Sequence, residues 1–435
     1  MENGMRKVAE RIKNGVKDEF GFVYSLDGQQ LLGCELGIRV DSYSIKEGTK
    51  IICDDAFCNC GSIKQVTIPN TVEIIGKKAF YGCLSLQQVN IPNSVKIIDD
   101  SAFKYCESLQ QFIIPESVID ICDGAFSFCG AFTESKKMEI SSLSKRFVVE
   151  NDFLIDNKEN KIISYFGKAE TLAIPDSIQT IGNGAFSECH LLKQVTIPTS
   201  VTKIGCSAFV DCRSLQQITI PNTITAISDC TFDYCVSLQQ VSIPQSVTAI
   251  GDCAFCYCKS LQELIIPDSV THIGNEVFTN CESLQKIVIP NSVNSIGCNP
   301  FCKCEKLVLE NKSAHYIVND GLLIDKQIGT IISYTEKNDS PIISDYIEHI
   351  GDKAFLGCKF LKQITIPNSV KTIGEKAFLG CESLQQITIP DSVTCIGDEA
   401  FMLCESLQQI VVPKDSIEKI KALLPKKMCD KIVVE

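Results

Sequence analysis

The sequence predicts an α/β solenoid: a coil whose turns stack into one continuous core, with a parallel β-sheet on one face and short helical turns and loops on the other. A 23-residue unit recurs along most of the 435 residues. Its apolar positions follow neither the period of a helix nor that of a strand throughout. A unit this short buries little alone, and a fixed period of about 20–50 residues is typical of stacked repeats.

The unit is clearest at 237–259, which reads SLQQVSIPQSVTAIGDCAFCYCK. Gln240–Ile243 alternates like a short strand and contains two β-branched residues. Pro244 cannot donate to a sheet, so we expect the strand to end there. Gly251 allows a sharp turn, and Ala254–Cys258 fits one short helical turn.

The repeats form three arrays, each marked by a phenylalanine every 23 residues. The arrays occupy about 43–130, 168–304 and 342–413. Each is preceded by two apolar runs joined by an Asp-led polar turn, which predicts a β-hairpin. We interpret each hairpin as part of an elongated repeat whose extra residues project as a two-stranded flap. The predicted role of the leading aspartates is turn formation, with a metal or catalytic role as the alternative, at Asp27, Asp156 and Asp325.

Segments at the two ends depart from the repeat and are predicted to cap a solenoid that spans 22–413. Residues 1–21 are predicted to form an N-terminal helix, because four apolar residues share one helical face, namely Met5, Val8, Ile12 and Val16. Residues 414–435 are predicted to form the C-terminal cap, with a helix that Pro425 breaks and a possible last strand at 432–434.

Cysteine occurs 25 times, and 13 of these residues lie three positions after the repeat phenylalanine. One position filled so regularly indicates packing, because a buried thiol behaves as a small apolar side chain. We therefore predict free thiols and a reducing, cytoplasmic compartment. The first twenty residues also lack the apolar core of a signal peptide. The alternative is a cell-surface or secreted protein whose export signal was removed or omitted.

Charge and motifs argue against several function classes. The net charge is −12 with scattered Lys and Arg, which disfavours nucleic acid, and no apolar run approaches the length of a membrane span. The C-x-C pairs lack histidines at ligand spacing, so we predict no metal site and no cofactor. Nucleophiles, carboxylates and histidines do not converge in a readable motif, which predicts a protein that is not an enzyme. The alternative is a composite pocket under a hairpin, near Asp156 or Asp325.

The segment LQQVSIPQSVTAIGDCAFCYC at 238–258 resembles the BspA-type leucine-rich repeat of bacteria and some protozoa. The shared pattern is L-x-x-[IV]-x-IP-x-x-V-x-x-IG-x-x-AF-x-x-C, and the resemblance covers roughly 22–435. The hairpin segments are also similar to the hairpin-containing repeats of that family, and the C-terminal segment is similar to a tail of its Bacteroides-type members. The resemblance implies a curved, right-handed leucine-rich-repeat coil. It also implies adhesion to matrix or host proteins, cell–cell contact or other protein binding, which are roles of exported members.

The outward positions of the strands are where we expect a partner to bind. Most strands present a Gln column beside a Thr or Ser column, which can hydrogen-bond along itself and keep the sheet soluble. Two adjacent units depart from this pattern, since they carry Glu263 and Ile265, then Lys286 and Val288. We predict a partner-binding patch there; the alternative is a local Glu–Lys pair between strands.

The predicted site consists of these four residues and the neighbouring outward pairs Gln240, Ser242, Gln217 and Thr219. The predicted function is a non-enzymatic protein–protein interaction scaffold with a protein partner of unknown identity. The alternative function is an exported adhesin that binds host matrix or other cell-surface proteins.

Overall fold

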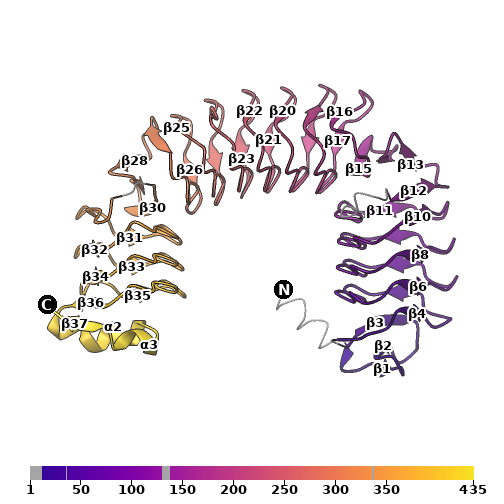
Figure 1. The fold of residues 1–435 in the computed structure, drawn as a ribbon, viewed down its shortest axis with the longest axis horizontal. Coiled ribbons are helices and arrows are strands. Elements are labelled where there is room, and N and C mark those ends of the chain that lie inside the picture. The colour runs from indigo at the N-terminus through magenta and orange to yellow at the C-terminus, as the bar shows by residue number, and fades with distance from the viewer. Residues whose placement is uncertain (1–11, 36, 130–137, 336–337) are drawn as a thin grey trace. The chain divides into compact units, whose positions relative to one another are not determined.

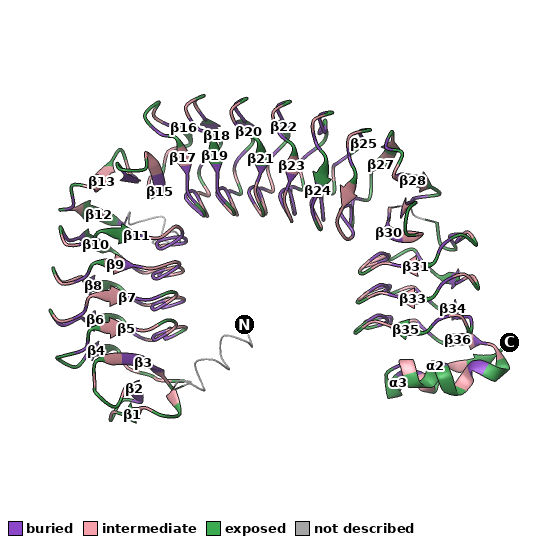
Figure 2. Cartoon of the chain, turned by 180° about the vertical axis from the view of Figure 1, so that it is seen from behind, coloured by how far each residue is buried: buried purple, intermediate pink, exposed green. Residues whose placement is uncertain are grey.

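The computed structural model describes residues 12–35, 37–129, 138–335 and 338–435 (Figure 1). The chain divides into two compact units, Met1–Arg213 and Ser214–Glu435, called here the N-terminal and C-terminal units. Within each unit the chain winds as a parallel-strand solenoid with little helix, which confirms the predicted fold class. Buried residues recur at corresponding places of successive coils (Figure 2).

In the N-terminal unit, each coil gives one short strand to a parallel sheet. Adjacent strands of this sheet come from successive repeats, so that Val66 lies opposite Val89. One sheet contains β4 (Ser42–Ser44), β6 (Gln65–Thr67), β8 (Gln88–Asn90), β10 (Gln111–Ile114) and β12 (Glu139–Ser142). Further along the chain, β16 (Thr171–Ala173) pairs in the same way with β18 (Gln194–Thr196).

A second parallel sheet is built from two-residue strands, and the sequence analysis did not predict it. The strands coincide with the isoleucine before the repeat glycine, where the apolar pattern is too short to show a strand period. In the N-terminal unit they are β5 (Ile51–Ile52), β7 (Ile74–Ile75), β9 (Ile97–Ile98), β11 (Asp120–Ile121), β17 (Thr180–Ile181) and β19 (Lys203–Ile204).

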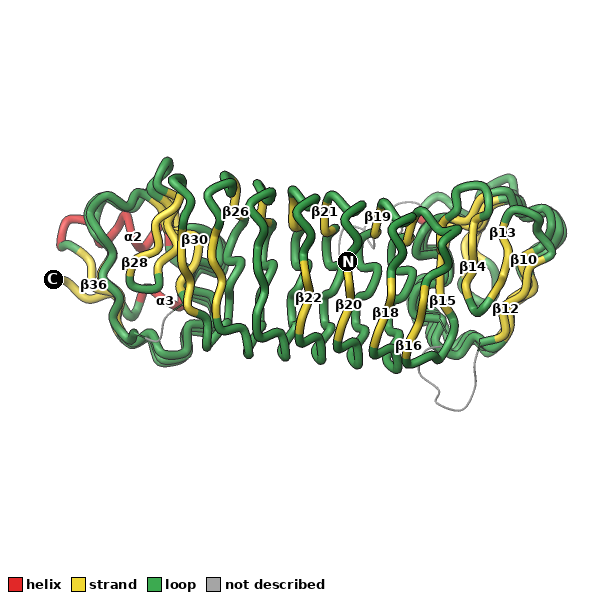
Figure 3. Tube along the Cα trace, turned by 90° about the horizontal axis from the view of Figure 1, so that it is seen from above, coloured by secondary structure: helices red, strands yellow, loops and turns green. Residues whose placement is uncertain are grey.

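The C-terminal unit repeats both layers. Its first layer contains β20 (Gln217–Thr219), β22 (Gln240–Ser242), β25 (Lys286–Ile289), β27 (Val308–Asn311), β32 (Gln363–Thr365), β34 (Gln386–Thr388) and β36 (Gln409–Val412). Its second layer contains β21 (Ala226–Ile227), β23 (Ala249–Ile250), β24 (His272–Ile273), β26 (Ser295–Ile296), β31 (His349–Ile350), β33 (Thr372–Ile373) and β35 (Cys395–Ile396). Figure 3 shows β20 and β22 side by side.

The inserted hairpins extend the second sheet, so the prediction of projecting flaps is wrong. After each hairpin its last strand pairs in parallel with the next two-residue strand, as β15 does with β17. All four residues of β14 are buried, because the apolar runs of the hairpin contribute to the core. The strands are β2 (Phe22–Tyr24) and β3 (Gln30–Cys34), then β13 (Phe147–Glu150), β14 (Phe153–Asp156) and β15 (Lys161–Tyr165), then β28 (Tyr316–Asn319), β29 (Leu322–Asp325) and β30 (Thr330–Tyr334).

The two ends of the solenoid differ in structure. The predicted N-terminal helix falls mainly on residues 1–11, which lie outside the described residues. It does not reach Val16, because Val16–Lys17 forms strand β1, antiparallel to β2. Asp18 then directs a turn, since its Oδ1 accepts backbone N–H groups of Phe20 and Phe22 at 3.0 and 2.9 Å. At the other end η1 (Lys414–Ser416), α2 (Ile417–Leu423) and α3 (Lys426–Cys429) lead to β37 (Ile432–Val434), which pairs with β36.

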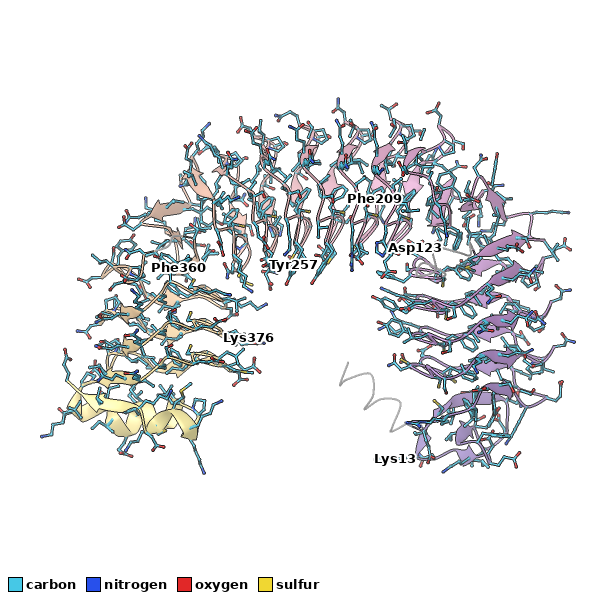
Figure 4. All side chains as sticks on the ribbon, viewed as in Figure 1. Lys13, Asp123, Phe209, Tyr257, Phe360 and Lys376 are labelled. Atoms are coloured by element: carbon cyan, nitrogen blue, oxygen red, sulfur yellow. The ribbon has the colours of Figure 1, made fainter. Side chains whose placement is uncertain are left out.

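The segment predicted as one helical turn, Ala254–Cys258, forms tight turns instead. The N–H of Phe255 donates to the carbonyl of Val277 at 2.9 Å, and that of Tyr257 donates to Thr279 at 2.7 Å. These bonds join neighbouring coils. Within the segment the N–H of Cys258 donates to the carbonyl of Phe255 at 3.2 Å, which closes a turn and not a turn of α-helix. Tyr257 adopts a left-handed φ of 56°, as Lys376 does in a later coil at 55°, and both lie at the turn ends of their coils (Figure 4).

The repeat phenylalanines stack into columns in the core. The rings of Phe255 and Phe278 are 5.7 Å apart with 4° between their planes, and Phe378 and Phe401 are 5.5 Å apart with 8°. In the N-terminal unit the rings of Phe80 and Phe103 stack in the same way, 5.0 Å apart with 4° between their planes. Aromatic side chains bury more apolar area than any other kind, so this column is a major source of stability.

The column cysteines join successive coils through their thiols as well as by packing. Cys258 Sγ donates to the carbonyl oxygen of Phe232 at 3.2 Å, and Cys281 Sγ donates to that of Phe255 at 3.1 Å. The same bond is made by Cys83, Cys106, Cys129, Cys212, Cys304, Cys381 and Cys404. A cysteine is therefore small enough for the core and polar enough to reach a backbone carbonyl.

The repeat glycine relieves a close approach between coils and does not serve a left-handed backbone; four coils have another residue at this position, namely Cys53, Asp99, Cys122 and Ser228. A Cβ on Gly251 would lie 2.7 Å from the backbone nitrogen of Asp229, in the preceding coil. Asp229 Oδ1 in turn accepts the N–H of Asp252 at 2.9 Å, so the chain is held tightly where the glycine stands.

Replacing Gly251 by Ala is expected to destabilise the protein by about 1–3 kcal/mol, because a Cβ overpacks this contact. The matched control is Gly61→Ala, since no atom lies within 4 Å of a Cβ added at Gly61. Urea unfolding measures both changes. An equal effect of the two substitutions would contradict the close approach.

Thiol titration of the folded protein is expected to separate the cysteines by burial. All 25 are free; Cys206 and Cys395 are exposed, and 12 are buried. Burial also raises the pKa of a column thiol, to about 12 for Cys404. We expect a thiol-specific reagent to label Cys206 and Cys395 quickly and the buried group only after denaturation. Rapid labelling of most cysteines in the folded protein would show that the column is not buried.

Candidate binding surface

The outward columns of the C-terminal unit begin as the sequence predicts. In β22, Gln240 and Ser242 are exposed on either side of the buried Val241. In β20, Gln217 and Thr219 have the same arrangement. Gln217 lies opposite Gln240 and Thr219 opposite Ser242, so a Gln column runs beside a Thr/Ser column.

The sheet is interrupted where the outward residues change. Glu263 makes isolated bridges to Gln240 on one side and Lys286 on the other. Ile265, two residues later, is 82% exposed and lies outside every strand of the described chain. Its neighbours Leu264 and Ile266 are buried, so the coil keeps its core while its outer face becomes apolar.

Strands β25 and β27 continue this change. Lys286 lies opposite Val308, and Val288 lies opposite Glu310. Val308 is 60% exposed. The sequence analysis missed Val308 and Glu310, because their coil lacks the Ile-Pro signature that aligns the other strands. We call the residues Glu263, Ile265, Lys286, Val288, Val308 and Glu310 the central patch.

The ion pair in the central patch differs from the one considered in the sequence. Lys286 Nζ contacts Glu310 Oε1 at 2.7 Å, on the following strand, whereas the sequence suggested Glu263. Both side chains are about half exposed, and such surface pairs contribute about 0.2–1 kcal/mol. The pair therefore does little for folding, and it lies among the aliphatic residues, because Lys286 is opposite Val308 and Glu310 is opposite Val288.

The aspartates of the hairpins all act in turns. Asp27 Oδ1 accepts the N–H of Gln29 at 3.0 Å, and Asp325 Oδ1 accepts that of Gln327 at 2.8 Å. Asp156 accepts the N–H of Lys158 at 2.9 Å.

Asp156 also forms a buried ion pair that the sequence did not reveal. It is 1% exposed, and its carboxylate receives Nη2 of Arg146 at 2.7 Å. Burial alone would raise the pKa of Asp156, but the hydrogen bonds and charge of Arg146 outweigh burial, and its pKa is lowered. The arrangement is that of a structural pair that anchors β13 against β14.

A cavity of about 440 Å³ lies where the third hairpin joins the following coil. Phe301, Tyr334 and Phe360 contribute aromatic rings to it, and its charged groups include Lys303 and Glu305. Among the described residues that line it there is no histidine and no aspartate, Asp325 included. The lining therefore offers no nucleophile–histidine–carboxylate arrangement of the kind sought under this hairpin.

A second cluster of polar side chains occurs in the N-terminal unit, where the sequence predicts no metal site. Glu188, His190 and Asp211 each place one potential ligand atom within 4.8 Å of the others, the one such group in the described residues. Glu188 and Asp211 both stand two residues after a repeat phenylalanine, in successive coils. That shared position is the signal by which the sequence could have revealed the cluster.

The two carboxylates of this cluster are buried and close to other charges. Glu188 and Asp211 are each 8% exposed. Burial raises the pKa of Glu188 to about 8, and the negative charges of Asp211 and Glu107 add to the effect. Arg213 Nε bonds to Asp211 Oδ1 at 2.7 Å. His190 Nδ1 lies 3.0 Å from the backbone carbonyl oxygen of Asp211.

In the described part of the chain, no helix combines the length and the apolar character needed to cross a lipid bilayer.

Comparison with known proteins gives a consistent result. Residues 37–147, 159–281, 225–311 and 326–428 match the BspA type Leucine rich repeat region, in six copies. No curated protein matches the chain.

Several solved structures are similar. A leucine rich cell surface protein from Faecalibacterium prausnitzii is 26% identical, with 67% of this chain and 94% of that chain covered and a TM-score of 0.47. A leucine-rich repeat protein from Bacteroides ovatus is 24% identical, with 97% and 96% covered and a TM-score of 0.36. The pneumococcal vaccine antigen PcpA is 18% identical, with 66% and 96% covered, and its TM-score of 0.50 supports the solenoid fold.

Proposed function

The chain belongs to the BspA-type leucine-rich-repeat family, and we propose that it is a non-enzymatic scaffold that binds another protein through the central patch. The observation that carries the proposal is the exposure of Ile265, at 82%, where the polar columns are interrupted. A large exposed aliphatic side chain offers apolar area that a partner can bury.

The composition of the central patch favours a protein as the ligand. Ile265, Val288 and Val308 supply aliphatic side chains, and the charged Lys286 and Glu310 lie among them, opposite Val308 and Val288. Protein interfaces combine apolar side chains with charged and hydrogen-bonding groups. The flanking Gln217, Thr219, Gln240 and Ser242 then serve as rim residues that can hydrogen-bond to a partner's backbone or side chains.

We also infer that the protein works in a reducing compartment, as in the cytoplasm. The support is the role of the column cysteines, whose reduced thiols donate to phenylalanine carbonyls. The alternative, an exported adhesin, calls for a chain that tolerates oxidation. Mass spectrometry of the protein from its native source distinguishes them, since disulfides among the 25 cysteines would favour the adhesin.

The central patch is tested with a partner isolated by affinity capture on the full chain. Titration calorimetry then compares the wild type with the double variant Ile265→Asp, Val288→Asp. We expect a loss of affinity of at least about 30-fold, because charges replace aliphatic side chains that the partner would bury.

The matched control is Thr365→Asp, Thr388→Asp, which places the same charges at the same outward column in β32 and β34. The control should bind like the wild type, and circular dichroism verifies that both variants fold. Unchanged affinity of the Ile265/Val288 variant would exclude the central patch as the binding site.

A further inference from the structure

We propose that Glu188, His190 and Asp211 form a binding site for a divalent transition-metal ion of the zinc class. The site lies within the N-terminal unit, and the proposal is independent of the central patch. Its three side chains come from two successive coils, and one ligand atom of each lies within 4.8 Å of the other two. The backbone at Glu188 and Asp211 has the same left-handed φ, 57° and 59°, so the two side chains start from equivalent positions in successive coils.

An unsatisfied oxygen in this cluster points to a ligand. Glu188 is 8% exposed, and its Oε2 is buried without a hydrogen-bond partner. A buried carboxylate oxygen without a partner is costly, so native proteins usually pair such an atom. A bound cation would supply that partner and would also screen the repulsion between Glu188 and Asp211.

The hydrogen bond of His190 suits a metal ligand. Its Nδ1 lies 3.0 Å from the carbonyl oxygen of Asp211, which can only accept, so Nδ1 carries the proton. The neutral tautomer then has its lone pair on Nε2. Histidines that bind metal ions through one ring nitrogen commonly donate the N–H of the other to a backbone carbonyl, which fixes the imidazole tautomer.

The ligand types favour zinc and its neighbours over calcium or magnesium. One imidazole and two carboxylates form a mixed nitrogen and oxygen set, whereas Ca²⁺ and Mg²⁺ prefer oxygen alone. Zinc binds its ligands at about 2.0–2.2 Å, and the three ligand atoms here all lie within 4.8 Å of one another. Arg213 occupies one lone pair on each carboxylate oxygen of Asp211, at 2.7 and 3.1 Å, and leaves another on each oxygen.

The charges that face the site are of both signs. Glu107 adds a third carboxylate near Glu188, while Lys104 and Arg213 oppose it. Outside the three proposed ligands these charges partly offset one another, so the attraction for a cation comes mainly from the ligands themselves.

The test uses the full chain after its accessible thiols have been alkylated, because free cysteines also bind zinc. Cobalt(II) is titrated into the protein, and the visible absorption of the bound ion is measured before and after addition of zinc. We expect one equivalent to bind, without a thiolate-to-cobalt charge-transfer band, and zinc to displace it. Glu188→Gln and His190→Ala should each weaken binding by at least about 100-fold.

His349→Ala is the control, since His349 Nδ1 lies 2.8 Å from Thr372 Oγ1, in the other unit, and belongs to no such cluster in the described residues. It should leave binding unchanged. Circular dichroism identifies any variant that fails to fold, and His190→Gln then replaces it. The proposal is overturned if no saturable equivalent binds, if Glu188→Gln and His190→Ala bind like the wild type, or if the bound cobalt shows a thiolate band.

Discussion

The structure depends on one constraint: each side chain of a coil must fit against its own counterpart in the next coil. No 23-residue coil has a core of its own, so the apolar residues are buried only between neighbours. The phenylalanine column shows the constraint most directly, since Phe255 and Phe278 stack with 4° between their ring planes. Fully burying side chains of this size supplies about 1.5–3 kcal/mol each, which makes stacking the main stabilising term.

The same constraint explains residues that are not aromatic. Gly251 is needed because the preceding coil comes within 2.7 Å of where a Cβ would stand. The column cysteines fit beside the phenylalanines and donate to their carbonyls, as Cys258 does to Phe232. Hydrogen bonds between coils also join the tight turns at Ala254–Cys258, where one helical turn was expected. The coils of this chain therefore resemble one another in sequence, because the residue at each position packs against the equivalent residue of the next coil.

The recurring residues predicted which side chains stack in the core, but they predicted the secondary structure of the short segments poorly. The Phe and Cys columns and the outward Gln240 and Ser242 followed from repetition alone. The second sheet was missed because strands such as Ile74–Ile75 are too short to show a period. Val308 was missed because its coil lacks the repeat signature. To predict that side chains of two coils lie close together, as Glu188 and Asp211 do, one must know how the coils align in space. The pattern of single residues along the sequence does not give that alignment.

The candidate functions lie where the stacked columns change their chemistry. At Ile265 a polar column becomes aliphatic, and at Glu188 and Asp211 a turn column becomes acidic. Neither change improves the stacking on which the fold depends. Both are therefore better explained by a ligand than by folding, as the exposure of Ile265 and the unsatisfied oxygen of Glu188 indicate.

Hydrogen exchange on Phe255→Ala tests the stacking constraint most directly, together with its unfolding free energy. The account predicts a loss of about 3–5 kcal/mol and a loss of amide protection centred on the coils of Phe232, Phe255 and Phe278, with distant coils of the C-terminal unit still protected. A loss below about 1 kcal/mol with unchanged protection in these coils would contradict it.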